Sequence, residues 1–226
     1  MPAGARAARI VPGRQLASTA ASSASTRAPL LEVRGLTRPA LRCGYLAVAG
    51  GECVAVTGAS GAGKTLLLRA IADLDPNDGE VSLAGESRRR MPAPQWRRNV
   101  MLVAAEPGWW EVQVLAHFRT LPDAALLERL GFRDETLDWA IDRLSTGERQ
   151  RLALLRALVE SPRVLLLDEP TSALDEDSKH AVEALLREHL SGGGGILMTT
   201  HERAQIARLG AREVRVADGS VVQDAA

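Results

Sequence analysis

The stretch that decides the fold reads Gly58-Ala59-Ser60-Gly61-Ala62-Gly63-Lys64-Thr65. It matches the whole pattern of a phosphate-binding loop, G-x-x-x-x-G-K-[ST]. The apolar run 53–56 before it predicts a buried strand, and the run 66–71 after it predicts a helix. Because a strand, a glycine-rich loop and a helix follow one another in the order this motif requires, the sequence predicts an α/β fold with a phosphate site at the helix N-terminus.

Three kinds of group in this loop favour phosphate. The glycines let successive backbone N–H groups turn inward and form a nest for an anion, and the helix points its positive end at the same place. Lys64 supplies a full positive charge for the β- and γ-phosphates, and the hydroxyl of Thr65 is a ligand for Mg²⁺. The alternative, a chance glycine-rich turn, is disfavoured by the motifs that follow.

A second run, residues 164–170, reads Val-Leu-Leu-Leu-Asp-Glu-Pro. Four consecutive aliphatic residues predict a strand buried on both faces, as in a parallel sheet. Unpaired charge is costly at the end of such a strand. We therefore expect Asp168 to hold Mg²⁺ through a bound water and Glu169 to act as the general base that polarises the attacking water. The alternative is a pair of solvated acids.

A third segment, residues 195–201, predicts another strand with a polar tip, and its last residue is His201. If its strand is a neighbour of the other two, His201 lies beside the γ-phosphate. A lone histidine is as readily a surface or packed residue, so this prediction depends on the strand order.

Two further segments carry a family resemblance. Leu144-Ser145-Thr146-Gly147-Glu148 resembles the signature motif of the ATP-binding cassette (ABC) ATPases, usually Leu-Ser-Gly-Gly-Gln, and Thr171-Ser172-Ala173-Leu174-Asp175 resembles their D-loop. His201 then falls at the position of their switch histidine. The resemblance covers residues 31–222, with the motifs in family order. Details around the D-loop are most similar to compact bacterial cassettes of metal- or iron-export type.

The resemblance implies a P-loop NTPase of ABC type, with a mostly parallel core sheet, an antiparallel β edge and a small helical lobe at about 106–146. It implies ATP and Mg²⁺ as cofactors and a head-to-tail homodimer in which Ser145 and Gly147 of one copy contact the γ-phosphate held by the other. It also implies Asp175 as a nucleotide-binding residue. Independently, Ser145 and Glu148 match a capping box that starts a helix.

As its function, the resemblance implies the ATP-hydrolysing subunit of a transporter. The subunit would power a membrane permease on a separate chain, at the cytoplasmic face of the inner or plasma membrane. The alternatives are a non-transport ABC-type ATPase of DNA maintenance or translation and a weakly hydrolysing regulatory cassette. The sequence has no long coiled-coil or zinc insertion and holds one cassette, which disfavours the first alternative.

The chain departs from the family pattern in three places. The signature has Thr146 and Glu148 in place of glycine and glutamine. The glutamine that usually follows the strand at 100–103 aligns with Ala105, so we expect Glu106 to replace it as an acceptor on the metal side. The segment 35–41 has no aromatic residue to stack on adenine, so we expect weak base selectivity, with GTP also accepted.

Composition sets limits on the remaining function classes. The 226 residues are 46% hydrophobic, and 28 basic side chains balance 28 acidic ones, so no nucleic-acid partner is expected. No apolar run approaches the length of a membrane-spanning helix. The two cysteines, Cys43 and Cys53, form no disulfide framework, and Cys53 on a buried strand suits a reducing compartment.

The chain ends differ from its middle. Residues 1–30 are rich in Arg, Ser and Ala, and the first acid is Glu32. The segment fits a disordered tail, upstream sequence translated from a misplaced start, or an organellar transit peptide, which would place the protein in an organelle. Residues 223–226 are read as a second short tail.

Four local patterns outside the motifs also lead to predictions. The apolar patches in 124–130 and 137–144 predict helices of the small lobe. Trp109 and Trp110 fit either an anchor for a partner or internal packing of this lobe. The basic residues 88–90 with 97–98 predict a solvated loop, with contact to anionic lipid as the alternative.

Overall fold

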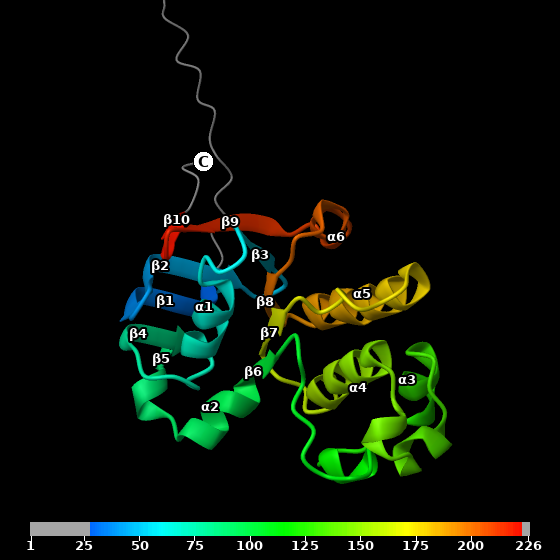
Figure 1. The fold of residues 1–226 in the computed structure, drawn as a ribbon. Helices are drawn as coiled ribbons and strands as arrows, with labels where there is room; N and C mark the ends of the chain where they lie inside the picture. Colours follow the sequence, from blue (N-terminus) through cyan, green and yellow to red (C-terminus); the bar gives the residue numbers. More distant parts are fainter. Residues whose placement is uncertain (1–27, 223–226) are drawn as a thin grey trace, which may run out of the picture.

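The computed structural model describes residues 28–222, which form one ten-stranded sheet with helices on both faces (Figure 1). The strand order is β5-β4-β1-β2-β10-β9-β3-β8-β7-β6. The five strands from β9 to β6 run parallel to one another, as the buried aliphatic runs predict. Their bounds are β3 Cys53–Thr57, β6 Val100–Val103, β7 Val164–Asp168, β8 Gly195–Thr199 and β9 Arg212–Ala217.

The other half of the sheet is mainly antiparallel. β1 (Pro29–Arg38) pairs antiparallel with both β2 (Leu41–Ala49) and β4 (Asp78–Leu83), and β5 (Glu86–Ser87) extends this edge. β10 (Ser220–Val222) pairs antiparallel with β9 and parallel with β2. The predicted fold class, a mostly parallel core with an antiparallel edge, is confirmed.

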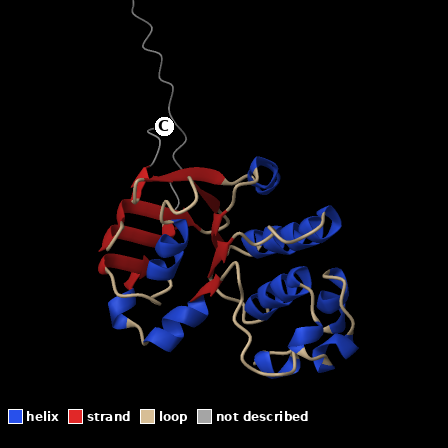
Figure 2. Ribbon diagram, viewed as in Figure 1, coloured by secondary structure: helices blue, strands red, loops and turns tan. Residues whose placement is uncertain are grey.

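Alternation along β3 gives each face of the sheet its own core. Val54 and Val56 pack with the apolar face of α1 (Lys64–Ile71), whereas Ala55 packs on the opposite face with residues of α4 (Thr146–Leu158) and α5 (Glu176–Ser191). Figure 2 shows α1 and α2 (Ala93–Asn99) apart from the group of helices on the other side. α6 (Arg203–Leu209) follows β8. The five parallel strands are therefore covered on both faces, and polar groups gather at their ends.

Residues 104–145 contain fewer helical residues than predicted. The patch at 124–130 forms α3 (Ala124–Arg129), with Asp123 as its N-cap. The patch at 137–144 does not form one helix, and the prediction is wrong there. It is split into 3₁₀ turns at Asp134–Asp138 and Ile141–Arg143, because Ala140 between them forms a β-bridge with Gln113. That bridge takes up backbone groups that a helix would use.

Two arginines of the basic cluster at 88–98 hydrogen-bond to groups near the C-terminus of α1. Arg88 is 7% exposed and donates to the carbonyl of Ala70 and to Oδ1 of Asn77. Arg97 donates to the carbonyl of Asp73. These guanidinium groups satisfy carbonyls at the negative C-terminal end of α1. The prediction of a solvated loop is therefore wrong for Arg88, which is also too buried to contact lipid.

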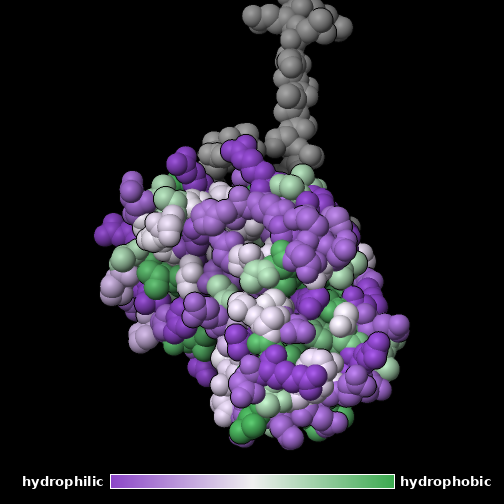
Figure 3. Space-filling view, turned by 45° about the vertical axis from the view of Figure 1, so that its right-hand side comes forward, coloured by the Kyte–Doolittle hydropathy of each residue, from purple (hydrophilic) through white to green (hydrophobic). Residues whose placement is uncertain are grey.

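The ends of the chain and its surface complete the description. The predicted tails fall mostly on 1–27 and 223–226, outside the described residues, whereas Pro29 and Leu30 belong to β1. Within 28–222, no helix is both long enough and apolar enough to cross a bilayer. The face in Figure 3 is mainly hydrophilic, with apolar residues in small groups.

Candidate nucleotide site

Two glycines set the shape of the loop between β3 and α1. Gly58 has φ 145°, and a Cβ there would lie 2.2 Å from the carbonyl oxygen of Val216, so only glycine fits against β9. Gly63 is the N-cap of α1 with φ 107°, and no side chain caps this helix. The first N–H groups of α1 therefore have no side-chain acceptor, as a phosphate site requires.

Lys64 brings the loop into contact with a distant part of the chain. Its side chain is 8% exposed, and Nζ donates to the carbonyls of Gly58 at 2.9 Å and Ala59 at 3.1 Å. Nζ also lies 3.1 Å from Nε2 of His201, which is 137 positions away in sequence. Because β3 and β8 are parallel neighbours, the loop after β3 and the histidine after β8 meet at one edge of the sheet.

Asp168, the last residue of β7, lies between two hydroxyls. Oγ1 of Thr65 donates to one carboxylate oxygen at 2.8 Å, and Oγ1 of Thr199 donates to the other at 2.6 Å. Thr65 and Asp168 are hard oxygen donors that suit Mg²⁺. Within residues 28–222 no group of three or more His, Cys, Asp or Glu residues forms a metal cage. This fits an ion that is held by one carboxylate, a hydroxyl and substrate phosphates.

Glu169 follows in the left-handed region, at φ 49°. Its carboxylate oxygen Oε1 lies 3.3 Å from Nε2 of His201. The parallel register pairs Asp168 with Thr199, so the residues that follow both strands leave the sheet at the same level. The pairing of β7 with β8 therefore brings Glu169 and His201 together beside the phosphate-binding loop.

One pocket unites most of the predicted phosphate-side residues. Four predicted site residues are not among the described residues that line this pocket. They are Glu106, which is exposed, and Ser145, Gly147 and Asp175. The roles of these four residues remain predictions. The lining residues are Ser60, Gly61, Gly63, Lys64, Thr65, Leu66, Asp168, Glu169 and His201.

A second pocket continues from the loop and shares Ser60 and Gly61 with the first. Ala59 and Ala62 lie on its wall, together with the ranges 38–42 and 215–220. None of the described residues that line it is aromatic. The second pocket therefore adjoins the phosphate-side pocket at the glycine loop.

The signature segment forms the N-terminus of α4. The predicted capping box is confirmed, because Glu148 N–H donates to Oγ of Ser145 at 3.2 Å and Ser145 N–H donates to the Glu148 carboxylate at 2.8 Å. These hydrogen bonds hold the pKa of Glu148 below its usual value. A Cβ on Gly147 would lie 3.0 Å from the carbonyl oxygen of Ala173, so α4 packs closely on the D-loop segment of its own chain.

Asp175 has a structural role of its own. Its carboxylate caps α5 by accepting from the N–H of Ser178 at 2.8 Å and from its hydroxyl at 3.1 Å. Hydrogen bonding to Ser178 lowers the pKa of Asp175.

Sequence reasoning missed two residues of the site. Thr199 was read only as part of a polar strand end, although it bonds Asp168. Gln150 follows the signature segment 144–148 in sequence, and its side chain donates to the carbonyl of Glu169 at 2.7 Å. A polar side chain on the buried face of a helix was the available signal, because Gln150 is 2% exposed.

Comparisons with known proteins agree on one family. The sequence profile of the family described as ABC transporter matches residues 45–172. The pyoverdine export ATP-binding/permease protein PvdT of Pseudomonas fluorescens is 34% identical over 200 residues, with 80% of this chain and 30% of that protein covered. The chain thus spans less than a third of the length of that relative.

Two further matches cover most of this chain and most of the matched protein. The aliphatic sulfonates import ATP-binding protein SsuB of Rhodopseudomonas palustris is 35% identical over 218 residues, with 90% of this chain and 76% of that protein covered. A solved structure described as the ATP binding subunit of an ABC transporter superposes with a TM-score of 0.77 at 27% identity, with 85% of this chain and 88% of that chain covered. These matches show that the chain belongs to the ABC transporter family, as an ATP-binding cassette.

Proposed function

We propose that this cassette binds ATP with Mg²⁺ and hydrolyses it to ADP and phosphate. One observation carries the proposal. Lys64 after β3, Asp168 and Glu169 at the end of β7, and His201 after β8 converge on one pocket at the edge of three adjacent parallel strands.

Each residue has a distinct role in the proposed reaction. The loop N–H groups and Lys64 bind the β- and γ-phosphates, and His201 contacts the γ-phosphate. Glu169 takes a proton from the attacking water, whose oxygen bonds to the γ-phosphorus as the bond to the ADP oxygen breaks. Mg²⁺, held by Thr65 and Asp168, would neutralise charge on the phosphates. In this proposal Glu106 is an acceptor on the metal side. Because it does not line the pocket, its segment would have to move toward the pocket for it to act.

A second copy of the chain completes the site in this proposal. Ser145 and Gly147 at the N-terminus of α4 lie outside the pocket of their own chain, so they are available to the γ-phosphate held by another copy. A head-to-tail homodimer with two ATP molecules at its interface follows. Asp175, at the start of α5, would lie near the same interface.

The proposed membrane partner is a permease on a separate chain, with the cassette at the cytoplasmic face of the membrane. Support comes from the segment after β6, where Trp110 is 67% exposed and Val112 is 74% exposed. Trp109 instead packs against the core under α4, and the guanidinium of Arg156 lies over both rings at 4.7 and 5.1 Å. Each interpretation of the tryptophan pair thus fits one of its members, and Trp110 is the candidate anchor. An organellar location depends on residues 1–27, outside the described part of the chain.

The test is Glu169→Gln, which keeps the shape of the side chain and removes the base. We expect steady-state ATP turnover to fall by about 100-fold or more while ATP affinity stays within about threefold of wild type. Release of phosphate and equilibrium binding of ATP measure the two quantities. Glu176→Gln, the same change at an exposed residue of α5, is the control. Turnover in Glu169→Gln equal to that of the control would exclude Glu169 as the base.

A further inference from the structure

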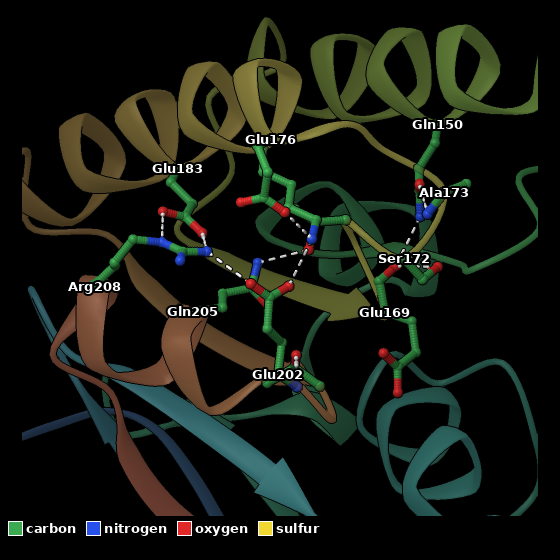
Figure 4. A network of polar contacts seen from close by, with 12 residues as sticks. Gln150, Glu169, Ser172, Ala173, Glu176, Glu183, Glu202, Gln205 and Arg208 are labelled. Atoms are coloured by element: carbon green, nitrogen blue, oxygen red, sulfur yellow. Dashed lines mark hydrogen bonds and ion pairs between the residues drawn. The ribbon is translucent and has the colours of Figure 1, made fainter.

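Gln150 connects the signature helix to the loop that carries Glu169. It is on α4, is 2% exposed, and points into the turn between Glu169 and Ala173 (Figure 4). Its Nε2 donates to the carbonyl of Glu169 at 2.7 Å, and its Oε1 accepts from the N–H of Ala173 at 3.4 Å. Both ends of one side-chain amide therefore bind the same short segment, at positions four residues apart.

The backbone of Glu169 needs such support. Its φ of 49° is in the left-handed region, which costs a residue with a side chain about 1–2 kcal/mol. A conformation of this kind persists only when its surroundings fix it. The N–H of Glu169 donates to Oγ1 of Thr199 at 3.0 Å, and its carbonyl accepts from Gln150 and, at 3.1 Å, from the exposed hydroxyl of Ser172. Gln150 is the buried one of the two side-chain donors to that carbonyl.

The direction of the Glu169 carboxylate follows from this backbone geometry. A displacement of this backbone would move the carboxylate relative to His201, whose Nε2 lies 3.3 Å from Oε1. A displacement of about 1 Å in a reacting group can reduce a rate by about 100-fold. A hydrogen bond that fixes this peptide therefore affects the reaction without touching the substrate.

We propose that Gln150 is a positioning residue, which holds the Glu169 peptide so that the carboxylate faces the γ-phosphate. This inference rests on the proposed hydrolysis with Glu169 as base. α4 begins one turn before Gln150, at the residues proposed to contact the second ATP. The same helix therefore holds the general base of one site and contacts the nucleotide of the other.

The test compares Gln150→Met with Gln205→Met. Gln205 is a matched control, because it is fully buried and its amide donates at 2.9 Å to Thr171 of the same loop but does not contact Glu169. We expect Gln150→Met to lower kcat about tenfold with the KM for ATP changed less than about twofold, which corresponds to the loss of one hydrogen bond. Gln205→Met should leave kcat within about twofold of wild type, and the unfolding midpoints of both variants report the loss of stability.

A merely structural role of Gln150 predicts a different pattern. It would change KM, kcat and the unfolding midpoint together, to the same extent in both variants, and that pattern would overturn the inference. If Gln150→Met does not fold, Gln150→Leu, which has a smaller side chain and also cannot donate to Glu169, replaces it. The same loss of kcat is expected, and a wild-type kcat would count against the inference.

Combination with Glu169→Gln separates this inference from the function on which it rests. In the Glu169→Gln background, Gln150→Met should cause no further loss of turnover, because the group that it positions is already absent. If wild type itself does not hydrolyse ATP, the proposed function is wrong, and if Glu169→Gln turns over like wild type, Glu169 is not the base. If Glu169→Gln is inactive while Gln150→Met is fully active, only the positioning role is wrong.

Discussion

The N-termini of α1 and α4 are both predicted to bind phosphate, yet they are built differently. α1 begins at a glycine with φ 107°, has no side-chain cap and has no acid in its first turn. α4 begins at Ser145, which forms a complete capping box with Glu148, so an acid lies in its first turn. The first helix leaves its N–H groups to a ligand, whereas the second satisfies two backbone N–H groups within its own chain.

This difference shows that a helix dipole alone does not define an anion site. Both helices carry the same partial positive charge at their N-terminus. At α1 the buried Lys64 adds charge, and Asp168 and Glu169 are near enough to act with it. At α4 the carboxylate of Glu148 opposes an approaching phosphate, and the segment 144–150 has one cation, Arg149, in place of a buried lysine. We therefore expect α1 to dominate affinity and α4 to contribute only in the closed dimer.

The largest expected effect comes from Lys64→Ala at α1. Loss of the charged hydrogen bonds to two phosphates should weaken ATP binding by about 100-fold or more. Equilibrium binding of a labelled ATP measures the change. Lys179→Ala, at the other lysine of the chain, is the control, because Lys179 pairs with Glu176 and Glu202 on the surface. Equal affinities in the two variants would contradict the dominance of α1.

A smaller effect of opposite sign is expected from Glu148→Gln at α4. The change restores the residue usual in the family and removes a negative charge where a phosphate from the second copy would lie. ATP turnover should rise about two- to fivefold, since one nearby like charge is worth at most about 1 kcal/mol at an exposed site. Glu128→Gln on α3 removes the same charge from an exposed position as a control. An unchanged or lower turnover would mean that α4 does not meet a phosphate.

The fold was predictable because its main signals are local. Buried strands such as Val164–Asp168 are continuous aliphatic runs, and the glycine loop marks the first strand–helix junction. The split at Ala140 was not predictable, because the bridge to Gln113 that causes it joins residues far apart in sequence. Arg88 was misread for the same reason, since its partners at the C-terminus of α1 are visible only in the fold.

The site residues also differ in whether a local sequence signal or a long-range contact identifies them. Lys64, Asp168 and Glu169 lie in motifs whose residue types and order indicate their chemistry. The contact between Lys64 and His201 depends on β3 and β8 being neighbours, which the sequence could only state as a condition. Thr199 and Gln150 act through hydrogen bonds to residues in other elements, and a single sequence contains no pattern for such pairs.

The smallest expected effect is on the pH dependence of stability, through the carboxylate that caps the N-terminus of α4. Hydrogen bonds from Ser145, with smaller contributions from Arg151 and Arg143, lower the pKa of Glu148 in the folded chain. The stability contributed by this carboxylate is therefore fully present above its unfolded pKa of about 4.3 and is lost as the pH falls through the folded value.

Urea unfolding should find wild type more stable than Glu148→Gln by about 0.5 kcal/mol at pH 7, with the difference shrinking below pH 4.5. The other carboxylates are the same in both proteins, so their contributions to the difference cancel. A wild-type advantage that does not shrink at all between pH 7 and pH 3 would mean that the charge of Glu148 does not stabilise α4, and the contrast with the uncapped α1 would then rest on hydrogen-bond geometry alone.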